Sequence, residues 1–200
     1  MSRPLRKSFL IAFTALFGLN IINAQMNAKA DSTKLYNTKS NYVFLNYSLG
    51  GGDYPFAGLG LNLSRQFANG KTMAGVGLYY IGDTYTTNPE TYQIFPIMAD
   101  IRQLFMESPD GRFAVLVIAD AGYVVRINGH DSNDEGSFVY QNGWAINPGI
   151  SFRFNVFKNM GVMFDITWLH HGCARVWEPP VEKKDHVHWD FALLRGHVFF

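Results

Sequence analysis

Histidine and cysteine side chains gather near the C-terminal end of the sequence. Imidazole and thiolate groups are the ligands that zinc and copper prefer, so a metal site is one hypothesis here. The spacing matches no established zinc motif, and interfacial histidines without a ligand role are the simpler explanation. His170 adjoins this group, but it and His171 would point to opposite faces of a strand. We therefore predict no metal and no cofactor, and keep four side chains as rim candidates: His171, Cys173, His186 and His188.

Three carboxylates and three guanidiniums fall at positions of the same alternation in five predicted strands. Charges inside a protein persist only when they are paired and hydrogen-bonded, so we predict a buried salt-bridge network. A proton or ion path is the alternative role. The interior of an eight-stranded barrel is filled by side chains, which favours a structural role. The six residues are Asp100, Arg102, Asp120, Arg153, Asp165 and Arg195.

Segments with period-two alternation must position these groups. Turn residues separate the segments, and helical periodicity is weak throughout, which indicates an all-β architecture. Several segments are long enough for the about 9–11 tilted residues with which a β-strand crosses a bilayer. The eight predicted strands are residues 41–49, 56–67, 72–83, 92–105, 112–127, 137–154, 161–176 and 188–200.

The connections between these strands alternate in length. Those after even-numbered strands are tight, as at 68–71 with its hairpin-forming Asn69-Gly70 pair. Those after odd-numbered strands are longer, polar and rich in glycine or proline. Short turns on one side and long loops on the other are typical of transmembrane barrels, with the short turns in the periplasm. An even strand count places both termini on that periplasmic side.

The alternation also assigns the two faces of each strand. Leu59, Leu61 and Leu63 share one face of their strand, and small or polar residues occupy the other. Lipid contact requires the apolar face outside, whereas a soluble barrel has it inside. Glycines on the inner face would leave room in a narrow lumen. The sequence therefore predicts an all-β, eight-stranded antiparallel transmembrane up-and-down β-barrel.

The N-terminus has the order of a secretory signal peptide: basic residues, an apolar stretch at 8–22, and small residues. We favour cleavage after Ala24, with a second possible point after Ala30. A membrane anchor is the alternative, but the apolar stretch is short for a spanning helix. The predicted division is a signal peptide at 1–24, a short periplasmic segment at 25–40 and the barrel at 41–200.

Composition restricts the possible partners and the source of stability. The net charge is +1, so nothing favours nucleic acid as a partner. The single cysteine cannot form an internal disulfide, although small exported domains usually need such a crosslink. A closed barrel embedded in a membrane supplies stability by another route.

Three segments resemble strands of small OmpA/OmpX-type outer-membrane β-barrel domains: FPIMADIRQLF, AINPGISFRF and FALLRGHVFF. The sequence ends in Phe200, with Val198, Leu194 and Ala192 at alternating positions before it. This resemblance implies a location in the outer membrane of a Gram-negative bacterium and contact with its lipid. It also implies that the barrel-assembly machinery recognises the C-terminal strand ending in Phe200. We expect a monomer.

Catalysis finds little support, because no phosphate loop, nucleophile elbow, CxxC or HExxH motif is present. Outer-membrane lipid A deacylases are also eight-stranded barrels, with a His-x-Ser-Asn motif. His171-Gly172-Cys173-Ala174 resembles that motif loosely. The string His130-Asp131-Ser132-Asn133 fits its letters better, but we expect it in a loop. A serine nucleophile also needs a base and an orienting acid held in register.

We therefore predict a small integral outer-membrane barrel with a structural or surface-interaction role, such as adhesion, envelope integrity or partner binding. Loops displayed by a rigid scaffold often carry function, and residues 131–135 and 178–184 are the candidates. A lipid A deacylase-like hydrolase and a soluble periplasmic lipocalin-like binder are the alternatives.

Overall fold

The structure is a computed structural model that describes residues 41–51, 55–67, 70–83, 93–133, 136–157, 160–179 and 183–200. The predicted signal peptide and the segment up to residue 40 lie outside the described residues. Within the described part of the chain, no helix is long and apolar enough to cross a membrane.

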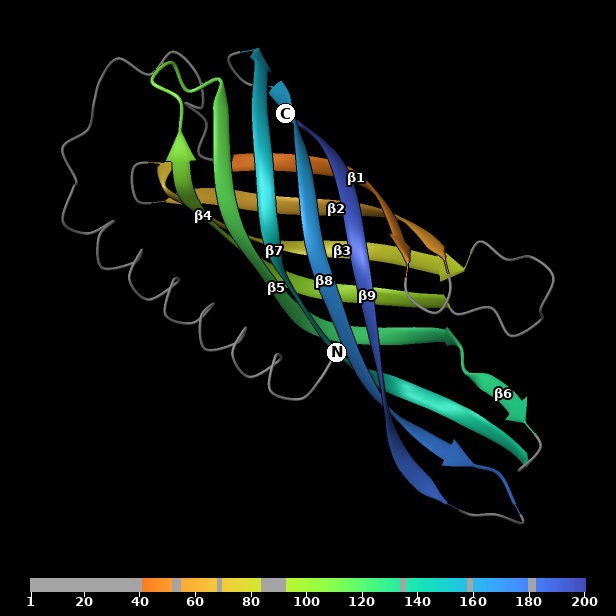
Figure 1. The fold of residues 1–200 in the computed structure, drawn as a ribbon. Helices are drawn as coiled ribbons and strands as arrows, with labels where there is room; N and C mark the ends of the chain where they lie inside the picture. Colours follow the sequence, from red (N-terminus) through yellow and green to blue (C-terminus); the bar gives the residue numbers. More distant parts are fainter. Residues whose placement is uncertain are drawn as a thin grey trace.

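Antiparallel strands form one sheet that closes on itself (Figure 1). Each strand pairs with its neighbour in sequence, except that β5 pairs with β7, and β1 pairs with β9 to close a ring of eight. The ninth strand, β6, follows β5 after Gly129 and pairs with the outer part of β7. The prediction of an eight-stranded antiparallel barrel is therefore confirmed. The strands are β1 Asn41–Gly51, β2 Phe56–Phe67, β3 Thr72–Asp83, β4 Gln93–Glu107, β5 Phe113–Asn128, β6 His130–Asn133, β7 Gly136–Phe157, β8 Met160–Trp177 and β9 Lys184–Phe199.

The turn between β4 and β5 shows how the short connections are built. Gly111 adopts a positive φ of 73°, which glycine tolerates without steric cost. The Ser108 hydroxyl donates a hydrogen bond to Asp110 Oδ1 at 2.7 Å, and the Arg112 backbone N–H donates to the same oxygen at 3.1 Å. These hydrogen bonds, first that of Ser108, lower the pKa of the Asp110 carboxyl from its usual value.

The closing seam joins β1 to β9. Its register runs from Phe44 opposite Phe199 to Gly51 opposite Ala192. Beyond it, Val43 and Phe200 exchange two backbone hydrogen bonds of 3.2 Å. The strand that ends the sequence is thus hydrogen-bonded on both of its edges, to β8 and to β1.

The two faces of the sheet have opposite polarity, as the alternation predicted. On the outside, Leu59, Leu63 and Ile166 are 63%, 56% and 59% exposed. On the inside, Asn62 and Asp165 are fully buried. A soluble barrel has the reverse arrangement, so this surface requires an apolar surrounding.

Part of the sheet continues past the rest of the ring, at the lower right of Figure 1. We call this part, residues 130–133, 136–142, 173–177 and 184–188, the outer extension. The predicted loops at 128–136 and 177–187 are therefore shorter than expected. Residues 184–187 belong to β9, where they pair with β8 as far as Val176 opposite Lys184.

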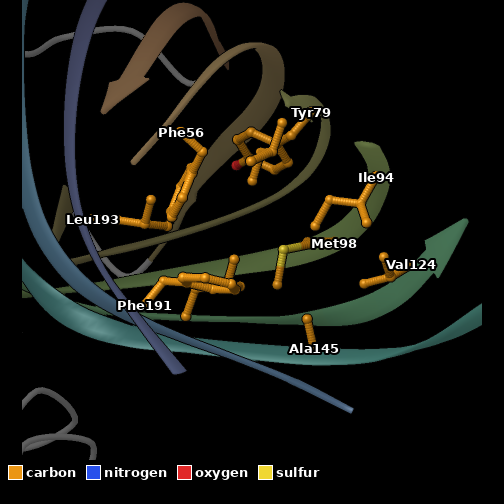
Figure 2. Close-up of a cluster of buried hydrophobic side chains, with 10 residues drawn as sticks. Phe56, Tyr79, Ile94, Met98, Val124, Ala145, Phe191 and Leu193 are labelled. Carbon is orange, nitrogen blue, oxygen red and sulfur yellow. The ribbon is translucent and has the colours of Figure 1, made fainter. Parts of the chain in front are cut away.

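Apolar side chains fill both ends of the interior. Toward the outer extension, Phe56, Tyr79 and Phe191 belong to a buried cluster whose side chains converge inside the ring (Figure 2). At the opposite end of the interior, Phe44 of β1 and Phe199 of β9 belong to a second buried cluster. Five of the six predicted charges come from strand positions between these two clusters, whereas Arg153 lies opposite Ala114 and Met163 of the second cluster.

Candidate functional site

Five of the six predicted interior charges form one continuous chain of ion pairs. Arg102 contacts Asp100 and Asp165, each at 3.1 Å. Arg195 contacts Asp165 at 3.2 Å and Asp120 at 2.7 Å. All five side chains are 0–3% exposed. We call these five residues the ionic layer.

Arg153, the sixth predicted charge, lies apart from the ionic layer. It pairs with Glu107 at 2.9 Å, and both side chains are almost fully buried. The pairing of β4 with β5 shifts register between Leu104 and Met106, and this shift changes which residues of β4 point inward. Glu107 therefore faces the interior, where it meets Arg153. Simple alternation through the strand could not have indicated Glu107.

Two further side chains, His197 and Asn147, bind two of the buried carboxylates, Asp165 and Asp120. His197 Nε2 lies 2.7 Å from Asp165 Oδ2, and the Asn147 amide donates to Asp120 Oδ2 at 2.8 Å. Sequence reasoning did not select His197. Its position two residues after Arg195 on β9 places it on the same face, and this was the available signal.

The four rim candidates lie on two different faces of the sheet. Residues directly opposite each other in a sheet share a face. His171 is opposite Trp189 and is buried inside with Cys173, whereas His188 and His186 are exposed outside, opposite Gly172 and Ala174. The structure therefore does not bring the four together. No group of three or more His, Cys, Asp or Glu side chains suited to a metal occurs among the described residues.

The string His171-Gly172-Cys173-Ala174, which loosely resembles the lipid A deacylase motif, directs its histidine and cysteine into the barrel. His171 and Cys173 face the barrel interior and are 1% and 4% exposed, so neither contacts the outer wall where lipid would lie. The second string, residues 130–133, forms strand β6 and not the loop that we expected. The string His171-Gly172-Cys173-Ala174 therefore does not place a nucleophile and a base toward a membrane lipid.

An outward-facing cluster occupies the wall beside the rim. His170 Nδ1 lies 2.7 Å from Asp190 Oδ1, and the Trp168 indole N–H donates to the same oxygen at 3.0 Å. His188 stacks on His170 with ring centroids 5.4 Å apart and planes 8° apart. The Trp144 ring lies 5.3 Å from His170. Sequence reasoning named His170 and His188 but missed their contacts with the carboxylate and the indoles.

The inner face of the outer extension carries an arginine that lies over two aromatic rings. The Arg175 guanidinium lies over Phe138 at 5.0 Å and over Trp177 at 4.8 Å. It also donates two hydrogen bonds to Asp185, at 2.9 and 2.5 Å. Such bidentate pairs fix geometry as well as contributing energy. These contacts join β7, β8 and β9 beyond the closed ring.

Comparisons with known proteins agree with this architecture. No protein-family model matches the sequence, and no curated protein matches it. Among solved structures, the chain is similar to Neisserial surface protein A, with 9% identity, a TM-score of 0.55, and coverage of 80% of this chain and 96% of that one. It is also similar to the outer membrane protein OprG from Pseudomonas aeruginosa, with 10% identity, a TM-score of 0.55, and coverage of 84% and 99%. The likeness shows the fold: this chain has the fold of small outer-membrane β-barrel proteins.

Proposed function

We propose that this chain is an integral outer-membrane protein with a non-catalytic surface-interaction role, such as adhesion, envelope integrity or partner binding. The apolar outer wall supports the membrane location, since large exposed apolar surfaces otherwise cause association. The buried ionic layer between two apolar clusters supports a structural role for the interior charges. A barrel filled in this way leaves the outer extension as the part that meets partners.

The observation that carries the interaction role is the outer extension itself. Its strands continue past the ring, and Arg175, Asp185, Phe138 and Trp177 hold them together. A surface that is already ordered loses less conformational entropy on binding than a flexible loop does. The extension is therefore a prepared platform that a structural barrel alone would not require.

The same proposal includes export and assembly. The predicted signal peptide would direct the chain to the envelope. As the resemblance to outer-membrane barrels implies, the barrel-assembly machinery would recognise β9 with Phe200, and the barrel would remain a monomer in outer-membrane lipid.

Labelling of intact cells tests the location and orientation. In a Cys173→Ser background, Ser137→Cys places a thiol on the outer extension, and Pro109→Cys places one in the turn at the opposite end; both positions are exposed. A membrane-impermeant maleimide should label Ser137→Cys in intact cells, and Pro109→Cys only after the outer membrane is opened. Equal labelling of both, or recovery of the protein in the soluble periplasmic fraction, would reject the location.

Attachment assays test the interaction role. Cells that express the protein should gain attachment to other cells or to a surface, relative to cells with an empty vector. An Arg175→Ala, Asp185→Ala variant should lose most of that gain, because the platform loses its bidentate pair. The matched control is Arg112→Ala, which removes an exposed arginine at the opposite end of the barrel. No gain with the wild-type protein would contradict the interaction role.

A further inference from the structure

The outward face of β9 changes character at Asp190. Between Asp190 and Phe200, the outward residues of β9 include Ala192, Leu194 and Val198, which are apolar. Toward the outer extension, they become basic: Lys184, His186 and His188 are all exposed. Such a change along one lipid-facing strand marks the level at which hydrocarbon gives way to headgroups.

Two exposed indole rings, on the neighbouring strands β7 and β8, lie near the same level of the barrel wall and support this position for the membrane interface. Trp168 and Trp144 are exposed on the outer wall of β8 and β7, on either side of the His170–Asp190 pair. Tryptophan gathers at membrane interfaces because its ring is apolar and its N–H is polar. Asp190 is tolerated at this level because His170 and Trp168 both bind its carboxylate.

A glycine brings the rings of this cluster together. A Cβ atom at Gly172 would lie 2.9 Å from His188 Nδ1 and 2.9 Å from Trp144 Cε2, so the two rings approach over a position without a side chain. The next outward residue of β8, opposite His186, is Ala174. With small residues opposite them on β8, His186 and His188 are both exposed, although His188 stacks on His170 on one side.

We propose that Lys184, His186 and His188, beside Trp144, bind the phosphate group of a lipid headgroup in the outer leaflet. The proposal rests on the proposed outer-membrane location. Lysine donates three hydrogen bonds, and an imidazole donates at least one whether neutral or protonated. Hydrogen bonds from cationic groups to phosphate are strong, and an anionic headgroup complements this basic stretch. The one carboxylate of the cluster, Asp190, is already bound by His170 and Trp168.

Native mass spectrometry of the purified full-length barrel in detergent tests the site, with phosphatidic acid as the probe and diacylglycerol as the lipid without a phosphate. Phosphatidic acid should bind more tightly than diacylglycerol, and equal binding of the two lipids would overturn the site. A Lys184→Gln, His186→Gln, His188→Gln variant should bind phosphatidic acid about tenfold more weakly or worse, as expected for lost hydrogen bonds to a charged group. Gly172→Val should also weaken binding, because it separates Trp144 from His188. Heat-dependent gel migration verifies that each variant is folded.

The matched control is Arg65→Gln, which removes an exposed cation near the opposite end of the barrel. Unchanged binding by the triple variant, or an equal loss in Arg65→Gln, would overturn the site. Displacement of the lipid by inorganic phosphate at equal concentration would show that the site takes free phosphate, and would overturn the lipid assignment. The assay uses purified protein, so its failure is distinct from a failure of the cell-labelling experiment.

Discussion

Replacing Asp165 with asparagine is expected to lower the free energy of unfolding by about 3–5 kcal/mol, the typical loss when a buried ion pair loses one partner. Asp165 contacts Arg102 at 3.1 Å, Arg195 at 3.2 Å and His197 at 2.7 Å, and it is fully buried. Arg102 would keep Asp100 and Arg195 would keep Asp120 as partners. The neutral amide, however, has one oxygen acceptor in place of the carboxylate that binds both guanidiniums and His197, so these buried charge-assisted hydrogen bonds would be weakened or lost. Urea unfolding of the barrel in lipid vesicles, followed by tryptophan fluorescence, measures the change.

Glu178→Gln is the matched control for this substitution. Glu178 faces His130 at 3.6 Å, and both side chains are well exposed. Exposed pairs contribute little, so we expect a change within about 1 kcal/mol. If Asp165→Asn were equally mild, the ionic layer would not be important for stability, and the structural role of the interior charges would be wrong.

Replacing Gly122 with valine is expected to prevent the barrel from closing. A Cβ atom at this position would lie 2.0 Å from the Ile97 carbonyl oxygen and 2.6 Å from Met98 Cα, both in the backbone of β4. A side chain can rotate away from another side chain, but β4 cannot move without breaking its pairing with β5. We expect a loss of about 3 kcal/mol or more, visible as disappearance of the folded band on unheated gels.

Gly196→Ala is the control for the glycine substitution. A Cβ atom there meets nothing within 4 Å, so this variant should fold like the wild type. Folding of Gly122→Val to the same extent as Gly196→Ala would show that β4 and β5 do not approach as closely as the structure has them.

Much of the fold could be predicted because side chains in a strand alternate strictly between two faces. That period placed Asp100, Arg102 and Asp120 inside and the leucines of β2 outside without knowledge of any contact. It could not show that Asp165 lies between Arg102 and Arg195. Such pairings depend on the stagger of strands around the ring, which no single strand records.

Irregular pairing explains most of what the sequence did not reveal. A register shift in β7 between Tyr140 and Gly143 changes which residues face inward, so alternation from the lower part of the strand does not extend to Phe138. The outer part of β9 was interpreted as loop because Lys184, Asp185 and His186 are polar in succession, so the segment shows no period-two alternation of apolar and polar residues.

The closing seam has a consequence for how the molecule forms. β1 and β9 come from the two ends of the described chain, so the ring cannot close until almost all of that chain has been placed. Until then, both strands have unpaired backbone groups along one edge, and such edges readily pair with other chains. Contacts between residues so distant in sequence also form slowly. The molecule therefore has a long period before closure in which it needs protection from aggregation, and a nearly complete barrel is as vulnerable as an open sheet.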